Sequence, residues 1–231
     1  MIHFNAALFL AIPLFGSAHA HPQKATGDVL VAQQQSTVSV PIYANPSCPI
    51  MGKPVSTRLF AETEKGRIYV CCKSCIKDIF DDLDPAYRTA FPTNKKIENT
   101  KCPVSGKEIK TDSPTVVLQG FEFFVADSVA VRRAREESQI VLAKLNDPKL
   151  TDLANSTCPV TGEATVKNAF VVIDGHLVRL SSPKLIEEIE KDPAKVLAKA
   201  KELRAKEEKE RDAAGTGEHR GTVGSNGRSP D

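Results

Sequence analysis

A motif that occurs three times constrains the fold of this chain more than any other feature. The pattern Asn-x-x-Cys-Pro-[Ile/Val]-x-Gly begins at Asn45, Asn99 and Asn155. Its three cysteines are 54 and 56 residues apart, a spacing too regular to arise by chance. A period of about 50 residues predicts a row of small structural units, here called copies one, two and three. A unit this small buries little apolar surface, so we expect it to depend on a metal, a disulfide or its neighbours.

The same elements follow the motif in each copy. Two runs rich in β-branched and aromatic residues, separated by a glycine, predict a β-hairpin, and a helical pattern comes next. The expected strands are Thr57–Ala61 and Arg67–Cys71, Thr115–Leu118 and Phe121–Val125, and Ala169–Ile173 and His176–Leu180. The expected helices are Lys73–Leu83, Ser128–Leu145 and Pro183–Lys191, the last with Ser182 as N-cap.

The fold class predicted is α+β, with three tandem units of knuckle, β-hairpin and helix that resemble treble clefs. A charged C-terminal helix and a disordered tail complete the chain. The predicted boundaries are 1–20 for a signal peptide, 21–40 for a flexible leader, 41–97, 98–150 and 151–192 for the three repeats, 193–212 for the charged helix and 213–231 for the tail.

The N-terminus has the features of a secretory signal. Ala6–Phe15 is an apolar run, and Ala18-His19-Ala20 fits a small-x-small cleavage site. Cleavage near Ala20 predicts a periplasmic or secreted protein, and no later stretch is apolar and long enough to span a membrane. Outside the cytoplasm the default fate of paired cysteines is a disulfide, which competes with any metal site.

Copy one holds four of the six cysteines of the chain. Cys48 lies in the knuckle, and Cys71 and Cys75 are expected on one face at the start of a helix, since they are four residues apart. Cys72 and Cys75, three residues apart, are an alternative pair. A helix N-terminus stabilises thiolates, so this arrangement predicts a metal site with ligands from a knuckle and a helix start.

These residues also resemble a known family. The spacing Cys-x22-Cys-x3-Cys, preceded by Ile68-Tyr69-Val70 and followed by Ile76-Lys-Asp-Ile-Phe80 and Asp84-Pro85-Ala86-Tyr87, is similar to the TRASH domain and the related YHS domain. The resemblance covers about Asn45 to Tyr87 and holds only in outline for the other two copies. It implies binding, sensing or trafficking of copper and similar ions, with Cys48, Cys71 and Cys75 as ligands.

One departure from a four-cysteine finger concerns the metal. Met51 stands where the knuckle of such a finger has its second cysteine, and copies two and three have Ser105 and Thr161 there. Cysteine with methionine suits Cu(I) better than Zn²⁺, and the alternative is a methionine that packs on the hairpin. The prediction is one site for Cu(I) or Zn²⁺ in copy one.

Copies two and three lack the helix cysteines. Aligning the glycines of the turns, which fall 18, 18 and 17 residues after their cysteines, places Val125, Ala126 and Val129, and Leu180, Ser181 and Lys184, opposite Cys71, Cys72 and Cys75. Cys102 and Cys158 are then buried small residues, partners in a disulfide, or ligands of a shared site. These copies, or the charged helix, are candidate surfaces for a protein partner.

Three functions remain open from the sequence. The first is an exported metal-binding protein, the second is a structural or interaction protein with disulfide-bonded or buried cysteines, and the third is a thiol–disulfide redox protein that uses Cys72-x-x-Cys75. A net charge of +2 and the absence of Trp give no reason to expect nucleic acid as a partner. We expect no enzymatic activity other than thiol–disulfide exchange, because no catalytic histidine or phosphate-binding loop is evident.

Overall fold

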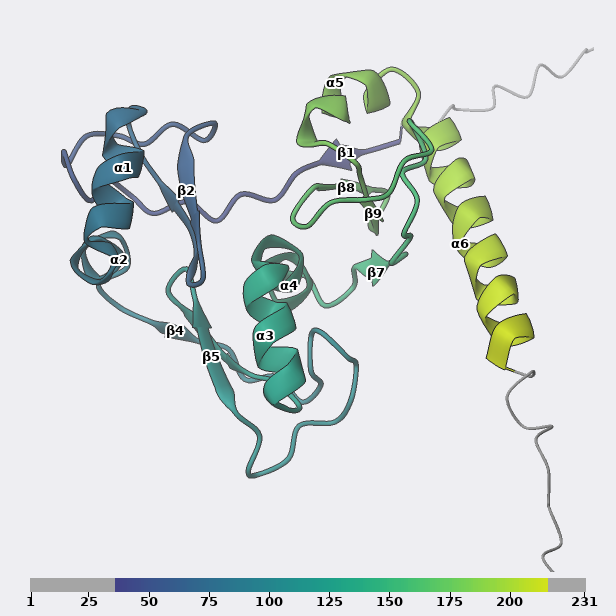
Figure 1. Cartoon of the computed structure of the whole chain (residues 1–231), viewed down its shortest axis with the longest axis horizontal. Helices are drawn as coiled ribbons and strands as arrows, with labels where there is room; N and C mark the ends of the chain where they lie inside the picture. Colours follow the sequence, from purple (N-terminus) through teal and green to yellow (C-terminus); the bar gives the residue numbers. More distant parts are fainter. Residues whose placement is uncertain (1–35, 216–231) are drawn as a thin grey trace, which may run out of the picture. The chain divides into compact units, whose positions relative to one another are not determined.

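Each copy of the repeat forms a two-stranded antiparallel hairpin followed by helices in the computed structural model, which describes residues 36–215. The three hairpins are shown in Figure 1. The mixed α+β class is confirmed, with three small sheets and six α-helices in the described part of the chain. The hairpins consist of β2 (Phe60–Thr63) and β3 (Gly66–Tyr69), β5 (Thr115–Leu118) and β6 (Phe121–Phe124), and β8 (Phe170–Ile173) and β9 (His176–Arg179). The predicted signal peptide, residues 21–35 of the predicted leader and residues 216–231 lie outside the described residues.

Short strands before the motif extend two of the hairpins into larger sheets. Strand β4 (Lys95–Lys96) pairs in parallel with β6, and β7 (Thr151–Asp152) pairs in parallel with β9. Lys95 and Lys96 fall in the range predicted for copy one, but they belong to the sheet of copy two. Strand β1 (Val38–Ser39), predicted as part of a flexible leader, pairs antiparallel with β8 of copy three. Sequence alone could not place these two-residue strands, because their partners lie 25 or more residues away.

The knuckle has the same backbone geometry in all three copies. The Cys48 N–H donates to Lys53 O at 2.8 Å, and the Gly52 N–H donates to Cys48 O at 2.8 Å. The same two bonds recur around Cys102 and Cys158. The glycine has a positive φ in each knuckle, 65° at Gly52, which explains why the motif ends in glycine.

The asparagine that begins the motif joins the knuckle to the hairpin. The Tyr69 N–H donates to Asn45 Oδ1 at 2.7 Å, and Asn45 Nδ2 donates to Tyr69 O at 3.0 Å and to Ser47 O at 2.7 Å. Three equivalent bonds link Asn99 to Phe124 and Lys101, and Asn155 to Arg179 and Thr157. The last residues of β3, β6 and β9 are therefore equivalent positions.

This equivalence corrects the alignment of the copies by one residue. The turn of copy one is Glu64-Lys65, and Gly66 already belongs to β3, whereas Gly120 and Gly175 lie inside their turns. The predicted alignment on the glycines was therefore wrong. Counted from the strand ends, the residues equivalent to Cys71, Cys72 and Cys75 are Ala126, Asp127 and Ala130 in copy two, and Ser181, Ser182 and Leu185 in copy three.

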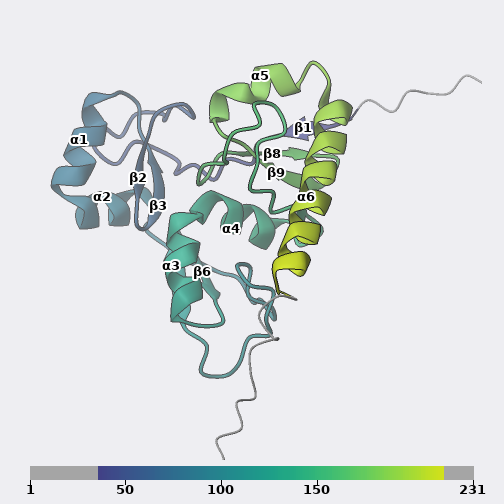
Figure 2. The same cartoon turned by 45° about the vertical axis from the view of Figure 1, so that its right-hand side comes forward.

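The helices break where a single helix was predicted. Copy one has α1 (Ser74–Asp81) and then α2 (Leu83–Ala90), which contains Pro85 in its first turn. A proline is tolerated there because the first N–H groups of a helix have no intrahelical partner, so Asp84-Pro85 starts a helix and does not merely end one. Copy two has α3 (Ser128–Glu136) and α4 (Ser138–Asn146), separated at Glu137 (Figure 2). Copy three has a short 3-10 helix, η1 (Pro183–Leu185), followed by α5 (Ile186–Ile189).

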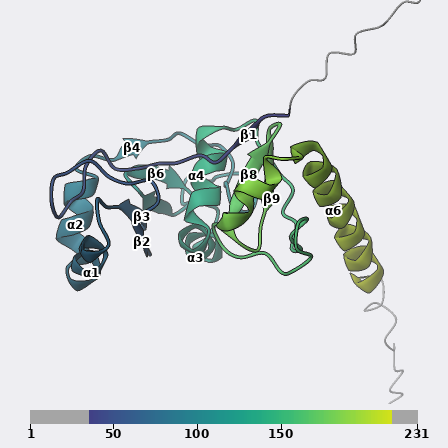
Figure 3. The same ribbon diagram turned by 90° about the horizontal axis from the view of Figure 1, so that it is seen from above.

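The C-terminal helix α6 (Pro193–Gly215) is continuous and extends beyond its predicted end at Asp212 (Figure 3). Leu197 and Ala200 are buried against the hairpin of copy three. Further along, the Glu207 carboxylate accepts hydrogen bonds from the Ser156 and Thr157 N–H groups, each at 3.1 Å. Among the helices that the structure describes, none is both long and apolar enough to cross a membrane.

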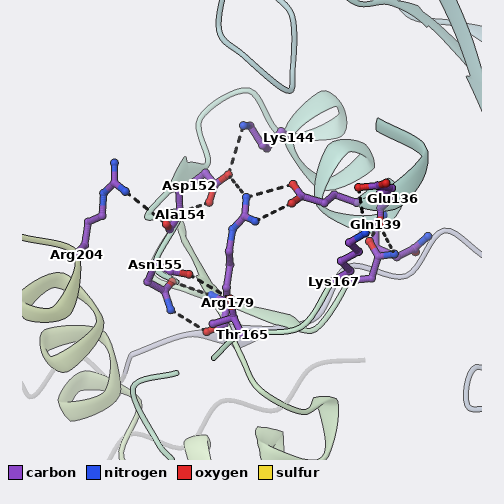
Figure 4. Close-up of polar contacts among 12 residues, drawn as sticks. Glu136, Gln139, Lys144, Asp152, Ala154, Asn155, Thr165, Lys167, Arg179 and Arg204 are labelled. Carbon is purple, nitrogen blue, oxygen red and sulfur yellow. Dashed lines mark hydrogen bonds and ion pairs between the residues drawn. The ribbon is translucent and has the colours of Figure 1, made fainter. Parts of the chain in front are cut away.

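Each copy has a core of its own, and both apolar and polar side chains join the copies. The core of copy one contains Val70 and Ile79, and a further apolar cluster lies between α4 and the β8–β9 hairpin. Arg179 of β9 pairs with Glu137 at 3.1 Å. It also pairs with Asp152 at 3.1 Å (Figure 4).

A second junction consists of amide side chains. Gln119 lies in the turn of copy two, and its Oε1 accepts the Arg67 N–H of copy one at 3.0 Å. The Gln139 N–H donates to Asn168 Oδ1 of copy three at 3.0 Å, and the Gln139 and Gln119 side chains also hydrogen-bond to each other. These contacts bring residues of all three copies together.

Candidate metal centre

Three cysteine sulfurs of copy one converge from three different elements. Cys48 comes from the knuckle, Cys71 from the end of the hairpin and Cys75 from the first turn of α1. Their Sγ atoms all lie within 4.8 Å of one another, and the Cys71 and Cys75 sulfurs are 3.9 Å apart. No other group of three or more His, Cys, Asp or Glu side chains in residues 36–215 meets the same condition.

The distances fit a thiolate metal site. With metal–sulfur bonds of about 2.3 Å, sulfurs are about 3.8 Å apart around a tetrahedral ion and about 4.0 Å apart around a trigonal one. The 3.9 Å between the Cys71 and Cys75 sulfurs lies between these values. The cluster can therefore bind a metal ion with little movement of its ligands.

The burial of the cluster is uneven. Cys48 and Cys75 are each 1% exposed and belong to the core of copy one, whereas Cys71 is half-buried. Two sulfurs of the site lie on its apolar side, and the Cys71 side is partly exposed to solvent.

The knuckle stabilises its cysteine as a thiolate. Burial raises the pKa of the Cys48 thiol, but hydrogen bonds from the backbone N–H groups of Cys71, Met51 and Ile50 outweigh burial, so the pKa lies below its usual range. Cys102 and Cys158 have lowered pKa values for the same reason, with N–H donors from equivalent residues. This cradle of N–H groups is a property of the repeat, and the metal cluster adds to it in copy one only.

The other two sulfurs of the cluster favour the protonated form. Burial and the neighbouring thiols raise the pKa of Cys75 to about 12, and burial followed by the hydrogen bond with Cys48 raises the pKa of Cys71. A metal must displace these protons, because only a thiolate is a strong ligand. Metal affinity should therefore increase with pH.

Cys72 lies beside the cluster. Its sulfur is 3.4 Å from that of Cys75 and 3.1 Å from the Ser74 hydroxyl. Hydrogen bonds from the Ser74 hydroxyl and then from the Cys75 N–H lower the pKa of Cys72 to about 6. The Cys72 sulfur thus accepts a backbone N–H in the first turn of α1. Asp127 has the same role at α3, where its carboxylate accepts the Ala130 N–H at 2.8 Å.

Met51 is 52% exposed, and it is not part of the apolar core of copy one in the described part of the chain. At the same place in copy two, the Ser105 hydroxyl hydrogen-bonds to the Cys102 sulfur. A side chain at this position of the knuckle can therefore reach the knuckle sulfur.

The cysteines of copies two and three have no thiol cluster around them. Cys102 and Cys158 are 2% and 0% exposed and belong to two separate apolar cores. All six cysteines are free, so no disulfide joins these two. They behave as small buried residues, which was one of the three alternatives open from the sequence.

Sequence reasoning missed the role of two residues near the site. Asn45 recurs in the motif, but only the hydrogen bonds to Tyr69 show that it holds the knuckle against β3. The hydrogen bond between the Ser74 hydroxyl and Cys72 could not be predicted from the sequence, except that Ser74 lies between Cys72 and Cys75. No protein-family model, curated protein or solved structure matches this chain.

Proposed function

We propose that this protein binds one thiophilic metal ion through Cys48, Cys71 and Cys75, as a module related to the TRASH and YHS domains. The observation that carries the proposal is the convergence of three sulfurs within 4.8 Å in copy one. The cluster occurs only where the sequence supplies extra cysteines, although all three copies share the knuckle and the hairpin. The fold does not require these thiols, and a ligand role accounts for them.

The donor set favours Cu(I). Three thiolates are soft ligands and suffice for a trigonal ion, whereas a structural Zn²⁺ site needs a fourth protein ligand. The exposed Met51 thioether is the candidate for an additional ligand, and it too is soft. Zn²⁺ with water in the fourth position is the second possibility for the metal.

The half-buried Cys71 suggests that the ion exchanges with other carriers, so we infer a role in binding, buffering or passing on the metal. The apolar segment Ala6–Phe15 supports export, after which a bound ion would protect the thiols from oxidation. Copies two and three would then act as scaffold or as a surface for a partner.

The test is a metal titration of the full chain, purified and reduced without oxygen, with Cu(I) and Zn²⁺ in competition with a chromophoric chelator. We expect one ion per chain by native mass spectrometry. Cys71→Ser and Cys75→Ser should each weaken binding by about 100-fold or more, since even changes outside the ligand shell cost about 10- to 100-fold.

Cys102→Ser is the matched control, because it replaces a buried cysteine with serine, as Cys75→Ser does, but lies in another copy. Its metal affinity should equal that of the unmodified chain. Met51→Leu should weaken Cu(I) binding more than Zn²⁺ binding. A chain that binds neither ion, or equal affinities for Cys75→Ser and Cys102→Ser, would contradict the proposal.

A further inference from the structure

Cys75 has two sulfur neighbours that compete for it. Its sulfur lies 3.9 Å from that of Cys71, with which it forms the metal cluster, and 3.4 Å from that of Cys72. The shorter distance belongs to the cysteine that is not part of the three-sulfur cluster. A bond between Cys72 and Cys75 would remove one of the three ligands.

The fold does not need a thiol at position 72. The equivalent residues are Asp127 and Ser182, and both accept a hydrogen bond from an N–H group at the start of the following helix. Cys72 occupies the same position, where an oxygen acceptor serves the backbone in the other two copies. A cysteine there adds reactivity that a helix cap does not require.

The position of Cys72 also suits a thiol that attacks a small-molecule disulfide. Cys72 is half-buried, whereas Cys75 is 1% exposed. An accessible cysteine followed three residues later by a buried one, at the start of a helix, is the arrangement in which one thiol attacks and the other resolves.

We propose that Cys72 and Cys75 form a dithiol that reduces small-molecule disulfides, and that this exchange and metal binding exclude one another because both use the Cys75 sulfur. The proposed disulfide reduction depends on the Cys72–Cys75 geometry alone. The proposed exclusion between exchange and metal binding rests on the proposed metal function. The substrate class is a low-molecular-weight disulfide such as glutathione disulfide.

The exchange proceeds in two steps. The Cys72 thiolate attacks one sulfur of the disulfide, a Cys72–glutathione bond forms, and the first glutathione leaves as a thiolate. The Cys75 thiol loses its proton to solvent and attacks the Cys72 sulfur, so the Cys72–Cys75 bond forms and the second glutathione leaves. Two protein thiols are oxidised and one disulfide is reduced to two thiols.

The final bond requires a small movement. A disulfide is about 2.0 Å long, so the Cys72 and Cys75 sulfurs must approach by about 1.4 Å from their separation of 3.4 Å. The Cys71 sulfur would have to move further toward Cys75, and it is held beside Cys48. A Cys72–Cys75 bond is therefore expected ahead of a Cys71–Cys75 bond.

The experiment treats the reduced full chain with glutathione disulfide, with and without one equivalent of Zn²⁺, an ion without redox chemistry of its own. Peptide mass mapping identifies the bonds, and the rate of glutathione release measures exchange. We expect a Cys72–Cys75 bond in the metal-free chain and strong protection by Zn²⁺. Oxidised chain should bind no Zn²⁺ until it is reduced.

Three variants separate the parts of the proposal. Cys72→Ser should keep its Zn²⁺ affinity but slow glutathione release by about tenfold or more. Cys71→Ser should form the Cys72–Cys75 bond at the same rate with or without Zn²⁺, because it lacks the metal site. Cys102→Ser should behave as the unmodified chain in every arm.

Two results would overturn the inference. One is a Cys71–Cys75 bond, or a glutathione adduct that never resolves, as the main product of the metal-free chain. The other is equal oxidation rates for loaded and metal-free chain although Zn²⁺ is bound. If the chain forms the Cys72–Cys75 bond but binds no metal, the proposed disulfide reduction is supported and the proposed metal function is contradicted.

Discussion

At the scale of single residues, the asparagine of the motif does as much as the cysteine to build the knuckle. Asn45 and Asn155 are 1% and 0% exposed, and the amide of each bonds both backbone groups at the end of a hairpin. An amide suits this role, because its Nδ2 group donates to the backbone C=O while its Oδ1 accepts from the backbone N–H.

Replacing Asn45 with Ala should destabilise copy one. The Tyr69 N–H and C=O would lose their partners in a buried environment, and each buried unsatisfied group costs about 1–3 kcal/mol. We expect Asn45→Ala to lower the free energy of unfolding of the metal-free chain by about 2–4 kcal/mol, measured by chemical denaturation.

Asn94→Ala is the control, since Asn94 is exposed and lies outside the motif. It should change the unfolding free energy by less than about 0.5 kcal/mol. Equal effects of the two substitutions would show that the Asn45 amide does not support the knuckle.

The candidate site was largely predictable at this scale, because its chemistry is carried by residue type and spacing. Cys48, Cys71 and Cys75 were predicted as ligands, and their sulfurs converge in the structure. Cys72 was a candidate too, but the three-sulfur cluster does not include it. Side-chain direction decides this, and sequence spacing does not describe it.

At the scale of elements, the tip of the first hairpin shows why the copies are not interchangeable. Gly66 has φ +92°, and a Cβ atom there would lie 2.8 Å from the Gln119 side chain of copy two. Gln119 cannot move away easily, since it also donates to Tyr43 O at 2.7 Å and accepts the Arg67 N–H. The glycine is required by a contact between copies as well as by its own backbone.

Gly66→Ala should therefore destabilise the chain more than a knuckle substitution does. A positive φ costs an alanine about 1–2 kcal/mol, and the overlap with Gln119 adds to this, so we expect about 2–4 kcal/mol in total. Thermal or chemical unfolding measures the difference.

Gly52→Ala provides the comparison, because Gly52 also has a positive φ but has open space where its Cβ would lie. It should cost only the backbone term of about 1–2 kcal/mol. If the two variants were equally stable, the packing of Gln119 on Gly66 would contribute nothing.

At the scale of the whole molecule, a partly buried network of ion pairs helps to join copies two and three. Arg179 pairs with Glu137 at the break between α3 and α4. It also pairs with Asp152 of β7 (Figure 4). Burial raises the pKa of Asp152, but Arg179 and then Lys144 outweigh burial and hold the pKa below its usual range. The ionised carboxylate is thus part of the folded structure.

Arg179→Met should remove this support while it keeps most of the side-chain volume. Glu137 would lose its ion-pair partner and Asp152 would keep only Lys144, at 3.5 Å, which we expect to cost about 2–4 kcal/mol at pH 7. The exposed Arg135, which pairs with Glu64 at 3.8 Å, is the control, and Arg135→Met should cost less than about 1 kcal/mol.

The cost of Arg179→Met should depend on pH. A lowered carboxyl pKa contributes stability above the unfolded value of about 3.9, and this contribution is lost as the pH falls through the folded value. The stability difference between the unmodified chain and Arg179→Met should therefore shrink below about pH 4. A difference that stays constant from pH 7 to pH 3 would show that the charge of Asp152 is not involved.

The sequence by itself determined the threefold period, the three hairpins and the restriction of the thiol cluster to copy one. These features depend on local patterns, such as alternating β-branched residues, a turn glycine and cysteine spacing, which act within one copy. The tertiary structure alone decided which residues are equivalent between copies, where helices break and which strands join which sheet.

The reason is that these choices depend on contacts between distant parts of the chain. Gly66 lies one residue later than Gly120 relative to the paired strands, and its backbone passes close to Gln119, a neighbour that no pattern within copy one records. A shift of one residue in a strand turns every side chain to the other face, so it also decides which cysteine meets Cys48. The sequence supplies the cysteines, but their arrangement as a site depends on packing in three dimensions.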